Sequence, residues 1–192
     1  MIKSNYSGRI NDPVQRQSLL AFINSAHDPL NLKQQFFDRL KQGSPTRSED
    51  SASHFCAFFA PFDPQEREVF IGHHIKGDRW LFNGGHLDQG ETPLQTVTRE
   101  MQEEWGSEIG DYQILDTNLI TVTHISSPNQ TCRIHYDLWF FVSLNKSQFK
   151  PDKMLLKKEF HRWGWKSEAE AMEICEKEDV QEALDMIFHD LI

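Results

Sequence analysis

The chain has 192 residues, a formal net charge of −9 at pH 7, and 38% hydrophobic against 26% charged residues. This length suits one domain plus an extension, and the composition is ordinary for a soluble globular protein. The acidic balance argues against nucleic acid as a partner, because a phosphate-binding surface needs an excess of basic residues. No apolar run approaches the roughly 18 residues of a membrane span, so no membrane partner is expected.

Cysteine content and the N-terminal residues indicate a cytoplasmic location. Residues 1–5 lack the apolar core of a signal peptide. The cysteines Cys56, Cys132 and Cys175 are odd in number and have no metal-binding spacing. We therefore expect three reduced thiols in a cytoplasmic protein.

The first fifty residues are expected to form a helical extension. Asp12 and Pro13 open one helix, and a second should cover about residues 30–42 and end at Gly43. Residues 44–53 are polar and are expected to form a linker. The extension could serve as a lid or as a dimerisation element of a homodimer, and the sequence does not distinguish these roles.

Three strand signals separated by turn signals precede the glycine pair Gly84-Gly85. The strands are expected at residues 54–60, 69–75 and 80–82, with turns at residues 61–64 and 76–78.

The best-defined predicted helix runs from Pro93 to Trp105. Thr92 is a good N-cap and forms a capping box with Gln95, while a proline at the first helical position loses no hydrogen bond. Gly106 lies where a C′ glycine is expected. One apolar stripe is predicted to pack on a sheet, formed by Leu94, Val97, Met101 and Trp105.

Three carboxylates lie beside that stripe. Two of them, Glu103 and Glu104, lie three and four residues after Glu100. All three should therefore share one patch of the helix and point into a cleft. Like charges this close repel each other unless a cation lies between them, and a hard divalent cation takes oxygen ligands. Arg99 could tie the helix to the preceding loop through Glu91.

The rest of the chain is predicted to complete a sheet and cover it. Two β-rich runs at residues 114–125 and 133–142 should form a hairpin, and residues 160–165 a last strand. Ser167 and Glu170 form another capping box, which opens a helix to about Cys175. A final helix with apolar residues at helical spacing should cover residues 180–191 and pack on the other face of the sheet.

The spacing around the acidic helix resembles the signature of the Nudix hydrolases, G-x5-E-x7-R-E-U-x-E-E-x-G-U, where U is a bulky aliphatic residue. Gly85 is followed after five residues by Glu91, and after seven more by Arg99-Glu100-Met101-Gln102-Glu103-Glu104-Trp105-Gly106. Ser107 departs from the final aliphatic position. The segment Gly84-Gly85-His86 resembles a poorly characterised branch of this family.

The resemblance implies a fold and an activity. The fold would be an α+β, α/β/α sandwich with a mixed sheet between helices over residues 51–192, after the extension at residues 1–50. The activity would be hydrolysis of a nucleoside diphosphate linked to another moiety, giving a nucleoside monophosphate and a phosphorylated product. The cofactor would be Mg²⁺ or Mn²⁺, and the partner a small-molecule diphosphate, typically a nucleotide derivative.

The same resemblance implies metal ligands. Glu100, Glu103 and Glu104 would bind the cation, and Gly85 would let the backbone approach it closely. The cation would also overcome the repulsion between an acidic chain and an anionic substrate.

Catalytic and bracing roles are implied for five residues. The general base would be Glu100, Glu103 or an acid outside the signature, of which Glu159 is the strongest candidate. Glu91 and Arg99 would brace the loop against the helix.

Four residues are candidates for contacts with the substrate. His86 could contact phosphate, or it could hydrogen-bond the backbone of its loop. Asp137 is an acid in an apolar strand, so it should either face the cleft or lie at a sheet edge. Trp80 and Phe82 share one face by alternation and could stack on a base, or pack in the core.

Several histidines are expected near the same sheet but match no zinc-binding spacing, so a zinc site is not expected from the sequence. They are His73, His74, His124 and His135.

Two other functions stay open. A ligand-sensing domain of this family commonly lacks metal-binding glutamates, and none is missing here. An isomerase of isopentenyl-diphosphate type would need a reactive cysteine, and neither Cys56 nor Cys132 has an obvious reactive context in the sequence.

Overall fold

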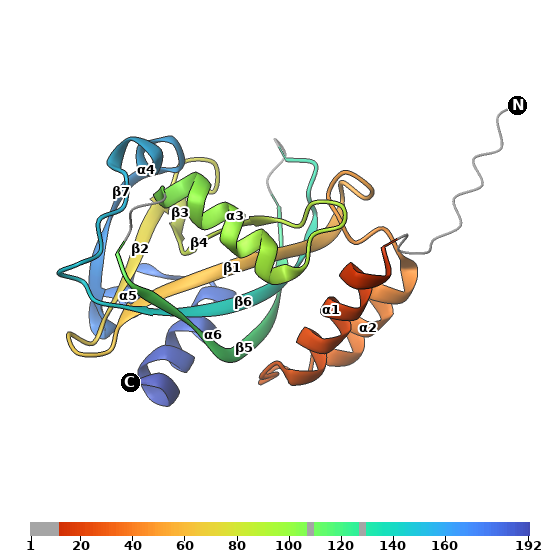
Figure 1. Cartoon of the computed structure of the whole chain (residues 1–192), viewed down its shortest axis with the longest axis horizontal. Helices are drawn as coiled ribbons and strands as arrows, with labels where there is room; N and C mark the ends of the chain where they lie inside the picture. The colour runs from red at the N-terminus through yellow and green to blue at the C-terminus, as the bar shows by residue number, and fades with distance from the viewer. Residues whose placement is uncertain (1–11, 107–109, 127–129) are drawn as a thin grey trace, which may run out of the picture.

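The computed structural model describes residues 12–106, 110–126 and 130–192, and it contains a seven-stranded mixed sheet between helices (Figure 1). This is the predicted fold class. The strand order is β3-β2-β1-β6-β5, with β4 paired to β1 and β7 to β2. Ser107 and the tip of the predicted hairpin lie outside the described residues.

The elements follow one another in the predicted order. The strands are β1 (Ser53–Asp63), β2 (Glu68–His74), β3 (Arg79–Leu81), β4 (Asn83–His86), β5 (Tyr112–His124), β6 (Ile134–Leu144) and β7 (Phe160–Ser167). The helices are α1 (Pro13–Ser25), α2 (Lys33–Gln42), α3 (Pro93–Trp105), α4 (Lys153–Glu159), α5 (Glu168–Ile174) and α6 (Glu178–Asp185), which a π-helical turn, η1 (Met186–Leu191), continues. Within the described ranges, no helix combines the length and apolar character needed to cross a bilayer.

Strand β1 lies at the centre of the sheet. It pairs in parallel with β6 along its length, and antiparallel with β4 at Cys56–Phe59 and with β2 at Phe62 and Asp63. The prediction that Pro61 ends this strand was wrong. Pro61 lies between the two antiparallel pairings, where a residue without an N–H group is tolerated.

The alternation of β1 builds two apolar layers. Phe55, Ala57 and Phe59 pack with α1, α2 and α3, whereas Ala60 and Phe62 pack with α5 and α6 on the other face. In Figure 1, α3 crosses one face of the sheet, and α1 and α2 lie beside each other at one end. The N-terminal helices therefore belong to the same core as the sheet.

Helix α3 has the predicted bounds and both halves of the predicted capping box, and Gly106 caps it with a φ of +87°. Its apolar stripe differs at one position. Leu94 is 50% exposed, and Thr96 is buried in its place. The Thr96 hydroxyl donates to a Glu91 carboxylate oxygen at 2.9 Å, so a polar contact orients the first turn of the helix.

Two elements were missed in the sequence. Helix α4 is only seven residues long and is capped by Asp152, which accepts from the Met154 N–H at 2.7 Å. Strand β4 contains Gly84 and Gly85, and glycines usually weaken strands. Here both glycines pair with β1, opposite Phe58 and Ala57.

Arg39 anchors the linker that follows α2. Its side chain is 2% exposed, and its guanidinium donates to the Gly43 carbonyl at 2.7 Å, the Ser44 carbonyl at 2.9 Å and the Ser53 hydroxyl at 2.9 Å. It also forms an ion pair with Asp50 at 3.4 Å. One buried cation therefore connects α2 to the start of β1.

We expect Arg39→Met to lower the free energy of unfolding by about 2–4 kcal/mol, because several buried carbonyl groups lose their donor at once. Urea unfolding followed by circular dichroism measures this. Lys41→Met is the matched control, since the Lys41 side chain is 66% exposed on the same helix. Equal losses in the two variants would contradict the anchoring role.

Candidate active site

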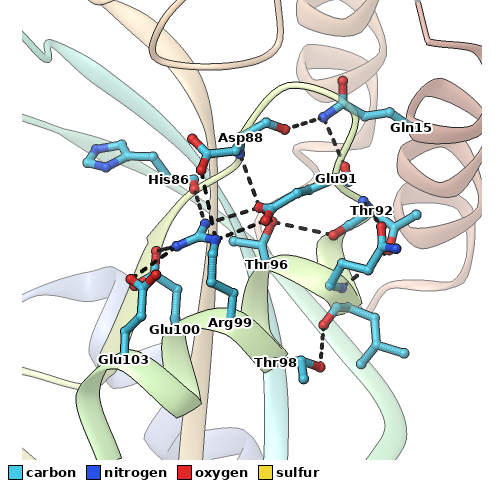
Figure 2. A network of polar contacts seen from close by, with 12 residues as sticks. Gln15, His86, Asp88, Glu91, Thr92, Thr96, Thr98, Arg99, Glu100 and Glu103 are labelled. Carbon is cyan, nitrogen blue, oxygen red and sulfur yellow. Dashed lines mark hydrogen bonds and ion pairs between the residues drawn. The ribbon is translucent and has the colours of Figure 1, made fainter.

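Arg99 is the centre of the polar network in Figure 2. Its guanidinium donates to the two carboxylate oxygens of Glu91 at 2.9 and 3.0 Å and to Glu100 at 2.7 Å. It also donates to the backbone carbonyl of His86 at 3.1 Å. The predicted contact between Arg99 and Glu91 is present, and its hydrogen bonds lower the pKa of Glu91. The loop before α3 and the end of β4 are thus held to the helix by three hydrogen bonds from Arg99.

Helix α1 supports the same loop from the other side. The Gln15 side-chain amide donates to the backbone carbonyls of Asp88 at 2.8 Å and Glu91 at 2.9 Å (Figure 2). Gln15 is 1% exposed. No sequence pattern indicates this contact, because it joins residues more than 70 positions apart.

Four acids line one cavity of about 920 Å³, which is large enough for a nucleotide. One of them, Asp78, belongs to the turn between β2 and β3. Glu100 and Glu104 come from α3, and Glu159 is the last residue of α4. Among the described residues, Glu103 does not line this cavity, and its side chain is 59% exposed beside Arg99. The predicted convergence therefore involves two acids of α3, with Glu159 as the third.

Burial and crowding perturb the pKa values of two of these carboxyl groups, Glu104 and Glu100. Burial raises the pKa of Glu104 to about 8, against a hydrogen bond from the Asn83 amide that favours the charged form. The charges of Glu100 and Glu159 raise it further. Burial also raises the pKa of Glu100, which the neighbouring Arg99 counteracts. A cation between the acids would relieve this repulsion.

The residues present fit a hard divalent cation. The candidate metal-ligand atoms of these acids are carboxylate oxygens, the ligand type that Mg²⁺ and Mn²⁺ prefer. A Cβ atom on Gly85 would lie only 1.9 Å from Oε1 of Glu100, so the backbone of β4 approaches the carboxylate as closely as a glycine allows.

The cavity also contains basic residues that the sequence reading missed. They are Arg47, Lys76, Arg79 and Lys177. Lys76 and Arg79 flank one turn, whereas Arg47 and Lys177 come from distant parts of the chain, so no single local pattern indicates the group. Despite the net charge of −9, the cavity can therefore offer cations to an anionic ligand.

The two aromatic candidates have different surroundings. Phe82 is 2% exposed and packs edge-on against Trp139, although it also contributes to the cavity wall. Trp80 is not a wall residue of this cavity in the described structure. Its ring faces the guanidinium of Arg162 at 5.2 Å and the ammonium of Lys166 at 5.9 Å. Phe82 therefore packs in the core, and Trp80 lies half-buried against two cations of β7.

His86 lines the cavity, and its imidazole points away from Arg99 (Figure 2). The ring packs against His54 and His135, and Nε2 lies 3.9 Å from the Cys132 sulfur. Burial, aided by His54, lowers the pKa of His86 to about 3. Cys132 thus does have a histidine neighbour, which its sequence context did not reveal.

Asp137 neither lines the cavity nor lies at a sheet edge, because β6 pairs with β1 on one side and β5 on the other, so both expectations for it were wrong. Asp137 is completely buried, and its carboxylate accepts from the Thr123 hydroxyl, which also contacts Asp179 at 2.9 Å. Burial, together with the charge of Asp179, raises the pKa of Asp137 well above its ordinary value. Strand β5 and helix α6 cover this position, which a single strand pattern cannot show.

The chain resembles known proteins along most of its length. A family model described as NUDIX domain matches residues 52–188. An RNA pyrophosphohydrolase of Hydrogenovibrio crunogenus is 29% identical over 111 residues. That alignment covers 53% of this chain and 66% of the relative, slightly under two thirds of its length.

Solved structures share the fold at low sequence identity. A dihydroneopterin triphosphate pyrophosphohydrolase of E. coli superposes with a TM-score of 0.54 at 15% identity, over 70% of this chain and 94% of that one. An Ap4A hydrolase of C. elegans gives a TM-score of 0.52 at 18% identity, over 69% and 94% of the two chains.

We expect Gly85→Ala to weaken Mn²⁺ binding by about tenfold while the protein stays folded. The added methyl group displaces a flexible carboxylate, Glu100, instead of rigid backbone. Gly164→Ala is the control, since nothing lies within 4 Å of its Cβ position. Calorimetric titration measures the affinities, and wild-type affinity in Gly85→Ala would contradict the close approach.

The raised pKa of Asp137 predicts a pH dependence of stability. The folded state keeps a proton that the unfolded state releases above about pH 3.9, so the free energy of unfolding falls as the pH rises from there. The slope from one such proton is about 1.4 kcal/mol per pH unit. We expect Asp137→Asn to reduce the slope by up to about that amount above the unfolded-state pKa of about 3.9.

Denaturant unfolding at several pH values tests this expectation. Asp116→Asn, at an exposed position, provides the control and should leave the slope unchanged. An Asp137→Asn protein with the same pH dependence as wild type would show that Asp137 is ionised when buried.

Proposed function

This chain belongs to the Nudix family, and from that premise we propose that it hydrolyses a diphosphate linkage with the help of Mg²⁺ or Mn²⁺. The substrate would be a nucleoside diphosphate joined to another moiety, cleaved to a nucleoside monophosphate and a phosphorylated product. One observation carries the proposal: Glu100, Glu104 and Glu159 surround a nucleotide-sized cavity, and Gly85 packs against the first of them.

The metal would be held by the acids of α3. Glu100 and Glu104 lie in the cavity, and Glu103, four residues from Arg99, is exposed next to them. A bound divalent cation supplies an acidified water and stabilises charge on the leaving oxygen. The Arg99 guanidinium keeps Glu100 in place without neutralising Glu104.

The proton of the attacking water needs a base within hydrogen-bond reach. Glu100 is already paired with Arg99, and Glu103 is directed toward the same guanidinium at 3.4 Å. Glu159 lines the cavity and is 28% exposed, with His74 and Lys76 each 3.6 Å from its carboxylate. We therefore favour Glu159 as the general base over Glu103 and Glu100.

Substrate binding would use the basic residues of the cavity. Lys76 follows β2 and Arg79 begins β3, and both line the cavity. Their charges would hold phosphate oxygens next to the acids. His86 is neutral because of its low pKa, so it would contribute a hydrogen bond and not a charge.

The N-terminal helices would support the site. Gln15 bonds the loop that carries Glu91, and α1 and α2 share the core of the sheet. We propose that, within the extension at residues 1–50, the described part from residue 12 onward forms a fixed brace for a domain at residues 51–192, in preference to a mobile lid. A homodimer through other surfaces stays compatible with this role.

The candidate substrates come from the relatives and from the cavity. We propose to test an RNA with a 5′-triphosphate, dihydroneopterin triphosphate, Ap4A, nucleoside triphosphates in normal and oxidised form, nucleotide sugars and dinucleotide cofactors. RNA is included although the net charge argues against it, because a relative is named for RNA and the cavity contains basic residues. Reactions in ¹⁸O-labelled water would identify the attacked phosphorus.

We expect Glu104→Gln and Glu103→Gln to lower kcat on the best substrate by about 10²–10⁴, since a neutral amide neither holds the cation nor accepts a proton. Glu173→Gln, at an exposed position of α5, should keep wild-type kcat. Steady-state kinetics with Mg²⁺ and circular dichroism of the same samples measure this.

Full activity in both variants would refute the assigned roles. Cation binding without turnover of any substrate in the panel would instead favour a ligand-sensing domain.

A further inference from the structure

A second group of chemically reactive side chains lies on the wall of the same cavity. His54 of β1, His86 of β4, His135 of β6 and Cys132 just before β6 place one nitrogen or sulfur atom each within 4.8 Å of one another. The ring centroids of the three histidines are 4.8 to 5.2 Å apart. The sequence places these residues in three separate segments, so no spacing pattern indicates the cluster.

The register of the sheet brings the three histidines to one face. His54 pairs with His135 across β1 and β6, and His86 pairs with Cys56 across β1 and β4. Paired residues share a face, and so do residues two apart on one strand. His54 and Cys56 are two apart, so all three imidazoles project from the same side.

Two of the three histidines have a nitrogen atom with no hydrogen-bond partner among the described residues. His54 is fully buried, and its Nδ1 lies 2.8 Å from the Asp50 carbonyl oxygen, which can only accept. The proton is therefore on Nδ1, and Nε2 carries a lone pair. Within the part of the chain that the structure describes, Nε2 of His54 and Nε2 of His135 are both buried without a hydrogen-bond partner. Leaving such atoms unpaired is costly.

Burial lowers the pKa of all three histidines, so their imidazoles are neutral. Neutral imidazole is the form that binds metal ions.

We propose that His54, His86, Cys132 and His135 bind a transition-metal ion of the zinc class in a tetrahedral site. Nitrogen and thiolate ligands select such ions over Mg²⁺ and Ca²⁺. Bonds of about 2.0 Å to nitrogen and 2.3 Å to sulfur put tetrahedral ligand atoms roughly 3.3–3.6 Å apart. The widest separation in the cluster is 4.8 Å, so small side-chain rotations suffice.

The site has an outer partner and a path for entry. The Asp50 carbonyl orients His54 through its other nitrogen, as outer-shell groups do for metal-binding histidines. His86, Cys132 and His135 line the cavity, while His54 lies behind them, so the ion enters from the cavity.

Four protein ligands complete a tetrahedron, which assigns the ion a structural role. It would tie β1, β4 and β6 together beside the acids. It would also fix the residue whose backbone carbonyl accepts from Arg99, namely His86. This proposal does not depend on the hydrolytic activity, and its tests measure binding.

Cobalt titration of the full chain, after removal of metals by chelation, tests the proposal directly. Visible absorption bands typical of tetrahedral Co²⁺ should grow until one equivalent of Co²⁺ per protein has been added. A thiolate charge-transfer band should appear with them in the near ultraviolet. The charge-transfer band should disappear in Cys132→Ser and persist in Cys175→Ser, whose cysteine lies outside the cluster. An excess of Mg²⁺ should not displace Co²⁺.

A third variant separates this site from a neighbouring trio, Cys56, His135 and Asp137, whose ligand atoms also lie within 4.8 Å of one another. Cys56→Ser should keep the charge-transfer band. A band that is lost only in Cys56→Ser, or that survives in Cys132→Ser, overturns the proposal, as does its absence from the wild type.

Two further measurements keep the test independent of variant folding. X-ray absorption at the zinc edge of the wild-type protein should show one sulfur at about 2.3 Å and nitrogens at about 2.0 Å. Zn²⁺ should raise the melting temperature of the wild type but not of His54→Gln. A zinc shell of oxygen alone would overturn the proposal.

Discussion

The contacts of the Arg99 guanidinium are the interaction on which the candidate active site depends. A planar group with five donors reaches Glu91 in the loop, Glu100 in the helix and the His86 carbonyl in β4. Because these partners belong to three successive elements, one side chain fixes their relative positions. The close approach of Gly85 to Glu100 and the shape of the cavity both follow from that arrangement.

The cavity combines groups with opposing electrostatic requirements. Burial and the charges of Glu100 and Glu159 raise the pKa of Glu104, which favours a divalent cation, whereas the basic side chains of the cavity favour an anion. The histidine and cysteine cluster adds a neutral third region of nitrogen and sulfur donors. Carboxylate oxygens prefer Mg²⁺ or Mn²⁺, whereas imidazole and thiolate prefer ions of the zinc class. One cavity with both sets of ligands can therefore bind each ion at its own place.

Sequence patterns predicted the features of the site that depend on contacts between residues close in the chain. Capping residues, a fixed spacing of acids and the pairing of Arg99 with Glu91 were readable because their partners lie within one loop and helix. Other features could not be predicted in this way, because they depend on which strands and helices become neighbours. They are the contact of Gln15, the basic residues of the cavity and the burial of Asp137. The histidine cluster was missed for the same reason, because sheet register assembled it.

The sharing of one core by α1, α2 and the sheet has a consequence for the choice of domain boundaries. The family match starts at residue 52, yet the described helices before it cover apolar side chains of β1 and β6. A fragment trimmed to that match would expose Phe55 and Tyr136 to water and leave two loop carbonyls without their amide donor. The family match and the hydrophobic core therefore have different N-terminal boundaries. A protein expressed for experiments should include α1 and α2 before residue 52.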